Sequence, residues 1–182
     1  MNFETVYEIE PKIARWFGIR THLVVPNIGW GLGVSWELDL AVMTASDYLY
    51  EVEIKVRKHD LIRDQEKRKW LFYGGGKIRK LWFAMPEKLR PHIDFVPEIA
   101  GILIVSGEGK IEEIRKPVID QRARKLTDKE KYQLARLGTL RVWQAKEEIV
   151  RLRRRLIRRC DEKPTPPHEE TETNSHDEEP IG

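Results

Sequence analysis

The chain has 182 residues, of which 33 are basic and 30 acidic, giving a formal net charge of +3. Its single cysteine, Cys160, excludes an intrachain disulfide and fits the reducing cytoplasm, which is the expected location. No apolar run approaches the roughly 20 residues of a membrane span, and the N-terminus lacks the pattern of a secretory signal.

The N-terminal part of the chain predicts a helix, a strand and a glycine-rich loop. Residues 3–17 place apolar side chains at helical spacing, and Pro11 is expected to break or restart that helix. A β-branched run at 21–26 predicts a strand, and a loop with three glycines follows over 27–33. The loop lacks the glycine spacing of a dinucleotide-binding turn, so no such cofactor is expected.

Two alternating segments then predict a β-hairpin. Residues 36–42 and 50–56 alternate apolar and charged side chains, and a short turn separates them. If the turn occupies 45–47, Asp39 lies opposite Glu53, and this register depends on the length of the turn. Directly opposed side chains in such a pair have β-carbons about 5 Å apart. The hairpin therefore predicts two carboxylates in close proximity.

Opposed carboxylates in this hairpin predict a site for a divalent cation. Like charges at this distance repel, and Mg²⁺ (or Mn²⁺) removes the conflict by binding one or two carboxylates while keeping several waters. Those waters have a lowered pKa and supply the nucleophile for phosphodiester hydrolysis. Lys55, on the same face and opposite Glu37, is expected to hold that water or neutralise the phosphate. The alternative is a solvated sheet face in which Glu37, Asp39, Glu51 and Glu53 pair with lysines.

The following segments complete a mixed sheet. A charged helix is expected at 59–72, followed by strands at 80–85, 101–106 and 110–115. Together with the hairpin they predict an α/β (α+β) domain, in which helices flank a mixed central sheet. This domain is expected to occupy residues 1–125.

The C-terminal part predicts a long helix and an acidic tail. Thr127 and Glu130 form a capping-box pattern at the start of a basic helix, assigned to 126–160. Its apolar residues recur at heptad-like spacing, which favours docking against its own domain and leaves a homodimer open. The tail, 161–182, holds eight acidic residues and one basic residue, and is expected to be disordered. Residues 1–160 are therefore strongly basic, which points to a polyanion such as nucleic acid.

The order of these elements resembles the core of a known nuclease superfamily. A helix and a strand precede a strand bearing Asp39, a strand with Glu53-Ile54-Lys55, and a second helix. That order resembles the restriction-endonuclease-like core of the PD-(D/E)XK superfamily. Within it, the strand 50–56, the helix with Asp60 and Asp64, and the strand 81–86 resemble the MmcB-like DNA repair family. The likeness covers roughly residues 20 to 145.

The resemblance implies a catalytic metal site. The implied metal ligands are Asp39, Glu53 and the backbone carbonyl of Ile54, and Lys55 matches the catalytic lysine. The glutamate that many such nucleases carry on their first helix corresponds to Glu8 or Glu10, or is absent from this chain. The chain is thus expected to be a magnesium-dependent endonuclease (a deoxyribonuclease) in DNA repair or processing. The alternative is a non-catalytic nucleic-acid-binding protein with a nuclease-like fold.

Basic side chains in two places are expected to contact DNA phosphates. They are Lys58, Lys67 and Arg68 after the site, and Arg154, Arg155 and Arg158 near the end of the long helix. The arginines would alternatively form a solvated face that favours the helix dipole. The acidic tail is hypothesised to fold back on them and compete with DNA. No membrane partner and no small-molecule cofactor are expected.

Overall fold

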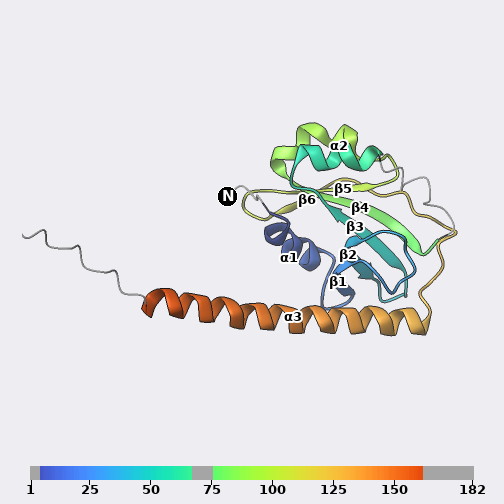
Figure 1. The fold of residues 1–182 in the computed structure, drawn as a ribbon. Helices are drawn as coiled ribbons and strands as arrows, with labels where there is room; N and C mark the ends of the chain where they lie inside the picture. The colour runs from blue at the N-terminus through green and yellow to red at the C-terminus, as the bar shows by residue number, and fades with distance from the viewer. Residues whose placement is uncertain (1–4, 67–75, 162–182) are drawn as a thin grey trace, which may run out of the picture. The chain divides into compact units, whose positions relative to one another are not determined.

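The protein is described by a computed structural model, which covers residues 5–66 and 76–161 and shows an α+β fold. Its elements are α1 (Val6–Trp16), β1 (Leu23–Ile28), β2 (Leu38–Met43), β3 (Leu49–Ile54), α2 (Lys58–Glu66), β4 (Ile78–Pro86), the 3₁₀ segment η2 (Glu87–Phe95), β5 (Gly101–Val105), β6 (Ile111–Arg115) and α3 (Asp128–Asp161) (Figure 1). The chain divides into two units, with the boundary between Gln144 and Ala145.

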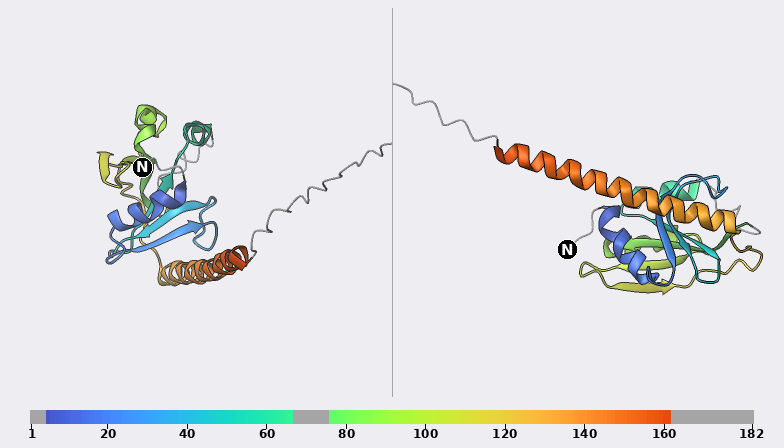
Figure 2. Two further views of the ribbon diagram at one scale, coloured as in Figure 1. Left: turned by 90° about the vertical axis from the view of Figure 1, so that its left-hand side faces the viewer. Right: turned by 90° about the horizontal axis from the view of Figure 1, so that it is seen from below.

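The strands form one mixed sheet in the order β1-β2-β3-β4-β5-β6, so that sequential strands are neighbours (Figures 1 and 2). β3 is parallel to β4 and β4 is parallel to β5, whereas the other pairs are antiparallel. Parallel neighbouring strands need a crossover connection between them. Here α2 lies in the crossover from β3 to β4, and η2 lies in the crossover from β4 to β5. The expected mixed central sheet flanked by helices is therefore confirmed, as is the long C-terminal helix.

Helices cover both faces of the sheet. Side chains alternate between the faces along each strand, and on one face Val52 and Trp82 pack with Ile9 and Ile13 of α1. On the opposite face, the side chains of β4 and β5 pack with α2 and η2, and those of β1 and β2 with the first half of α3. Polar side chains of β3 that point to this second face are consequently buried.

The β2–β3 hairpin has the predicted turn. The Thr44 amide donates to the Tyr48 carbonyl at 2.9 Å, and Asp47 takes the left-handed backbone conformation at φ 69°. The strands then pair with Leu40 opposite Val52, which is the register expected from the sequence. The turn thus determines which side chains meet at the far end of the hairpin.

Helix α1 runs through Pro11 without interruption, which corrects the expected break. Proline removes the hydrogen bond to the carbonyl four residues earlier, and here that carbonyl belongs to Tyr7. Tyr7 and Pro11 are both exposed, so water can hydrogen-bond the carbonyl and the helix continues.

Helix α3 begins with the predicted capping box. The Thr127 amide donates to the Glu130 carboxylate at 2.9 Å, and the Glu130 amide donates to Thr127 Oγ1 at 3.3 Å. The first half of the helix then packs on the body through Leu134 and Leu137.

The boundary between the two units lies inside α3, between Gln144 and Ala145. The reason is that the first half of the helix buries apolar side chains, whereas most side chains from Ala145 to Arg158 are exposed. The acidic tail lies outside the described residues except for the backbone of Asp161. No helix within 5–66 and 76–161 is at once long enough and apolar enough to cross a membrane.

Candidate active site

Strands β2 and β3 part at the end of the hairpin away from the turn. Their pairing stops at Leu40 and Val52. Beyond this point β2 stays paired with β1, and β3 stays paired with β4. Asp39 and Glu53 are the next residues on each strand, so the two expected ligands lie at this fork.

Asp39 is tied to the backbone of β3. Its Oδ2 accepts a hydrogen bond from the Ile54 amide at 2.8 Å. The following amide, that of Lys55, donates to Ala84 on β4 at 3.0 Å, so the Ile54 amide points the other way, toward β2. Because the N–H and C=O groups of one strand residue point to the same side, the Ile54 carbonyl also faces the fork. The backbone oxygen implied as a ligand is thus on the side of Asp39.

The Lys55 side chain lies among three carboxylates. Its Nζ is 2.6 Å from Glu53 Oε2, 2.7 Å from Asp64 Oδ2 and 3.9 Å from Asp39 Oδ2. The lysine side chain is 11% exposed, and Glu53 and Asp64 are each 3% exposed, whereas Asp39 is 32% exposed. The group is therefore closed on the side of Glu53 and Asp64 and accessible on the side of Asp39.

The electrostatics of this group keep Lys55 charged. Burial by itself lowers the pKa of a lysine. Here the charges of Glu53 and Asp39, together with hydrogen bonds to Asp64 and Glu53, outweigh the burial and raise the pKa of Lys55. The side chain is consequently an ammonium at neutral pH, able to offset negative charge but not to accept a proton.

The glutamates of β3 are buried, not solvated. Glu51 and Glu53 are both buried residues, and Glu51 Oε1 accepts a hydrogen bond from Trp36 Nε1 at 2.9 Å. The solvated sheet face considered as the alternative is wrong for both glutamates, because α2 and α3 cover this face. Glu37 is exposed, and Lys55 pairs with Glu53 and Asp64 instead. Glu37 and Lys55 therefore do not face each other as expected, because the pairing of β2 with β3 ends before them.

Asp64 is the member of the group that was not among the predicted ligands and catalytic residues, although its place on the helix after the hairpin allowed it to reach the edge of the site. It projects from α2 one turn after Leu61, which is also buried. A helix repeat places residues three and four apart on one face, so the apolar Leu61 was the signal that Asp64 faces inward. Its distance of 2.7 Å to Lys55 then joins α2 to the site.

The two candidate glutamates of α1, Glu8 and Glu10, have different surroundings. Glu8 accepts hydrogen bonds from the Thr5 amide and hydroxyl, at 2.9 and 3.0 Å, as part of an N-terminal capping box. Burial raises the pKa of Glu10, and the charge of Asp39 raises it further. Glu10 is therefore the first-helix carboxylate that lies near the fork, whereas Glu8 has a capping role.

The oxygen atoms at the fork suit a hard divalent cation. Asp39 and Glu53 are both within 4 Å of the same ammonium, and the Ile54 carbonyl faces the same side. Within the described ranges, no three His, Cys, Asp or Glu side chains form a ready metal cage. Mg²⁺ takes one or two carboxylates and completes its shell with water, so this donor set fits Mg²⁺ or Mn²⁺.

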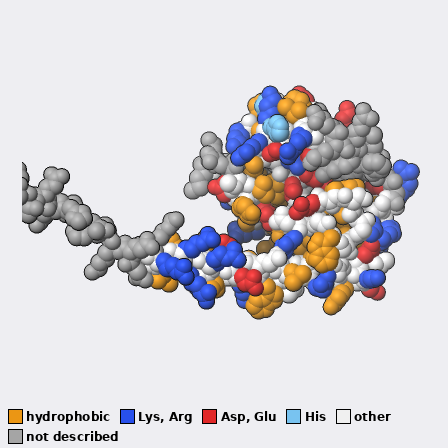
Figure 3. All heavy atoms as spheres, in the orientation of Figure 1, with side chains coloured by type: hydrophobic (Ala, Val, Ile, Leu, Met, Phe, Trp, Pro, Cys, Tyr) orange, Lys and Arg blue, Asp and Glu red, His pale blue; other side chains and the backbone are white. Residues whose placement is uncertain are grey.

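The residues expected to contact DNA fall into three places. Lys58 is exposed at the start of α2, the helix that also carries Asp64. Lys67 and Arg68 lie outside the described residues. Arg154, Arg155 and Arg158 are exposed in the second unit. Figure 3 shows basic side chains gathered along this C-terminal half of α3.

Comparisons with known proteins bear on the fold. No family model matches the chain, and no curated protein matches it. Among solved structures it is similar to the SPO1766 protein of unknown function from Silicibacter pomeroyi. That similarity has a TM-score of 0.54 and 13% identity, and it covers 78% of this chain and 88% of the other. A likeness at this identity supports the shared fold.

Proposed function

We propose that this protein is a divalent-metal-dependent nuclease that hydrolyses DNA phosphodiester bonds at the fork between β2 and β3. The observation that supports it is the buried Lys55 ammonium, shared by Glu53, Asp64 and Asp39 at 2.6, 2.7 and 3.9 Å. Burying several carboxylates beside one another opposes folding unless their charges are compensated. Such an arrangement is typical of a catalytic group, in which perturbed charges serve chemistry.

In this proposal Asp39, Glu53 and the Ile54 carbonyl hold Mg²⁺ or Mn²⁺, and Glu10 is an additional carboxylate near Asp39. When bound there, such a cation would supply a water of lowered pKa as the nucleophile. Lys55 stays protonated and offsets the negative charge that develops on the phosphate in the transition state. The partial exposure of Asp39 gives the substrate access to the site.

Basic side chains would hold the DNA strand beside this site. Lys58 is exposed on the helix that carries Asp64. Lys67 and Arg68, which follow along the sequence, are further proposed phosphate contacts. Arg154, Arg155 and Arg158, which belong to the second unit, are proposed to contact DNA phosphates as a separate group. The same proposal includes a role in DNA repair and membership of the MmcB-like family within the PD-(D/E)XK superfamily. It also includes a cytoplasmic location and a homodimer.

A cleavage assay with matched variants tests the activity. Supercoiled, linear, single-stranded and branched DNA are incubated with the full chain in Mg²⁺, Mn²⁺ or EDTA. The substitutions Glu53→Gln and Lys55→Gln should each lower the cleavage rate by roughly a hundredfold or more. Glu37→Gln is the control, because Glu37 is exposed on the same hairpin. It should leave the rate unchanged.

Binding measured in parallel separates the nuclease from a non-catalytic binding protein. DNA affinity is followed by fluorescence anisotropy at low and moderate salt, since phosphate contacts weaken as salt rises. DNA binding without cleavage in any metal would support the binding protein with a nuclease-like fold. Cleavage that persists in Asp39→Ala would remove Asp39 from the ligand set.

A further inference from the structure

Asp64 is a buried carboxylate that the proposed chemistry does not yet use. It is buried, on the face of α2 that packs against the sheet, and its Oδ2 is 2.7 Å from Lys55 Nζ. An aspartate is almost never this buried unless it is paired. Asp60, one turn earlier, contrasts with it, because Asp60 is partly exposed and forms a surface pair with Arg63 at 3.4 Å.

Lys55 has two carboxylate partners at nearly equal distance. Its Nζ is 2.6 Å from Glu53 and 2.7 Å from Asp64. An ammonium has three N–H donors, so it can bond both acids at once and keep one bond when the other is given up. Asp64 comes from α2 and Glu53 from β3, so giving up Glu53 leaves the lysine anchored to a different element.

This double pairing matters for a cation at the fork. The Glu53 oxygen that pairs with Lys55 is one of the two that Glu53 can offer as a ligand. A lysine with Glu53 as its sole partner would compete with the cation for that carboxylate. A lysine that is also ion-paired with Asp64 can yield Glu53 without leaving a buried, uncompensated charge, which is the strongly unfavourable alternative.

We propose that Asp64 is a positioning residue, which retains the Lys55 ammonium beside the site when Glu53 turns to a divalent cation. This role rests on the proposed metal site. Asp64 allows Glu53 to bind the cation while Lys55 stays in place as an ammonium. Asp64 acts through Lys55 in this arrangement and does not itself bind the cation or the substrate.

A double-mutant cycle on Mn²⁺ binding tests this role without using catalysis. Mn²⁺ affinity is measured by calorimetry for the full-length wild type, Asp64→Asn, Lys55→Gln and the double variant. In the presence of Lys55, Asp64→Asn should weaken Mn²⁺ binding by about tenfold, since the lysine then competes for Glu53. In the Lys55→Gln background the same change should weaken binding by less than about threefold. Asp60→Asn is the control and should leave the affinity unchanged.

A second readout follows the lysine itself. The Nζ–H resonance of Lys55 is observable when its ion pair protects the ammonium from exchange with water. In wild type it should remain visible after saturation with Mg²⁺, and in Asp64→Asn it should be lost. This measurement decides the question even if the double variant fails to fold.

Three results would overturn the proposal. The first is an equal loss of Mn²⁺ affinity on Asp64→Asn in both backgrounds, which would show a direct ligand or a general charge effect. The second is a Lys55 resonance in Asp64→Asn that is as well protected as in wild type. The third is the absence of Mn²⁺ binding by the wild type, which would contradict the proposed metal site as well. Failure of the proposed function is thereby distinguished from failure of the role of Asp64.

Discussion

The carboxylate of Glu130 and two of the three carboxylates around Lys55, those of Glu53 and Asp64, are largely buried, but the ratio of acids to cations is opposite in the two groups. Glu130, 13% exposed, is one acid bonded by two cations, with Lys77 Nζ at 2.6 Å and the Arg124 guanidinium at 2.8 Å. It also completes the capping box with Thr127. At the fork, one lysine is shared by three acids.

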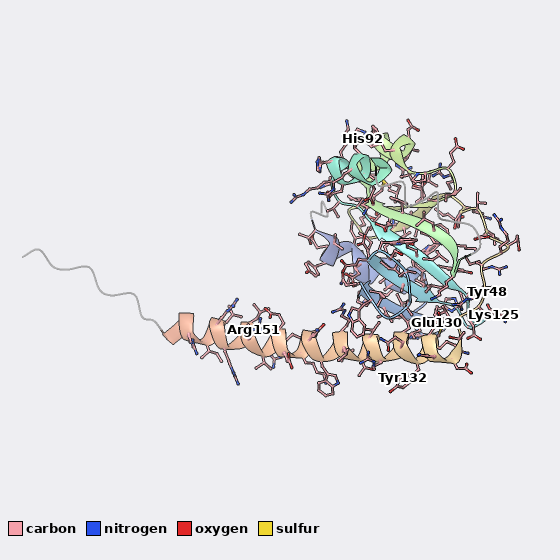
Figure 4. The ribbon with its side chains drawn as sticks, turned by 45° about the vertical axis from the view of Figure 1, so that its right-hand side comes forward. Tyr48, His92, Lys125, Glu130, Tyr132 and Arg151 are labelled. Atoms are coloured by element: carbon pink, nitrogen blue, oxygen red, sulfur yellow. The ribbon has the colours of Figure 1, made fainter. Side chains whose placement is uncertain are left out.

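The two groups serve different purposes. Glu130 lies in the first turn of α3 (Figure 4), and just before this helix the Leu126 amide donates to the Asp47 carbonyl of the hairpin turn at 2.9 Å. Hydrogen bonds from Arg124 hold the pKa of Glu130 far below its usual range, as suits a group that stabilises the fold. The fork has three acids for one lysine, an excess of negative charge that an additional cation would offset. The contrast therefore separates a structural carboxylate from candidate catalytic ones.

Removing Lys55 should have the largest effect. Lys55→Gln leaves Glu53 and Asp64 buried without the cation between them, and should lower the free energy of unfolding by about 3–5 kcal/mol in EDTA. Urea denaturation at neutral pH measures this. Lys88→Gln, at an exposed position of η2, is the control. A variant as stable as wild type would mean that Lys55 does not compensate these acids.

Neutralising Glu130 should have a smaller effect. Glu130→Gln should lower the free energy of unfolding by about 2 kcal/mol at pH 7, because charge-assisted hydrogen bonds are lost. Since folding lowers the pKa of this group from 4.5, its stabilisation is complete above the unfolded value and declines as the pH falls below it. The difference in stability between the two proteins, measured from denaturation curves between pH 7 and about pH 3, should therefore shrink toward the acid end. A difference that is independent of pH would contradict the role of the charge.

Adding a divalent cation should stabilise the fork group and leave the Glu130 group unaffected. At about ten times the dissociation constant, Mg²⁺ should raise the free energy of unfolding by about 1.4 kcal/mol relative to EDTA. Thermal melts of wild type, Glu53→Gln and Glu130→Gln measure this increase. It should disappear in Glu53→Gln and persist in Glu130→Gln. The reverse pattern would place the cation away from the fork.

Neutralising Glu10 should have the smallest effect, and its sign is opposite. Folding raises the pKa of Glu10 through burial and the charge of Asp39, so ionised Glu10 opposes folding. Glu10→Gln should therefore raise the stability at pH 7, by less than about 1 kcal/mol because the group is partly exposed. The gain should vanish as the pH falls below the unfolded value of 4.5. Weaker Mg²⁺ binding by the more stable variant would identify Glu10 as a functional acid.

Local patterns were sufficient to predict the hairpin and the capping box. The turn at 45–47 and the alternation of the two strands imply that Asp39 lies opposite Glu53, and the pairing of Leu40 with Val52 has that register. The Thr127 and Glu130 pattern likewise depends on residues three apart, and both hydrogen bonds form.

What could not be predicted depends on segments far apart in the sequence. The burial of Glu51 and Glu53 requires α2 and α3 to cover one face of the sheet, and alternation alone does not show which face is covered. The separation of β2 from β3 follows from β2 staying with β1 and β3 with β4. The contact of Asp64 with Lys55 depends on how α2 packs after the crossover begins.

The hydrogen bond from the Ile54 amide to Asp39 has a practical consequence. Most amides of a sheet donate to backbone carbonyls, but this one donates to a carboxylate at the fork, at 2.8 Å. Its chemical shift and its exchange with deuterium should therefore respond to whatever binds Asp39. The protein thus carries a spectroscopic reporter in its own backbone, through which cations, nucleotides or inhibitors can be screened without a label at the site.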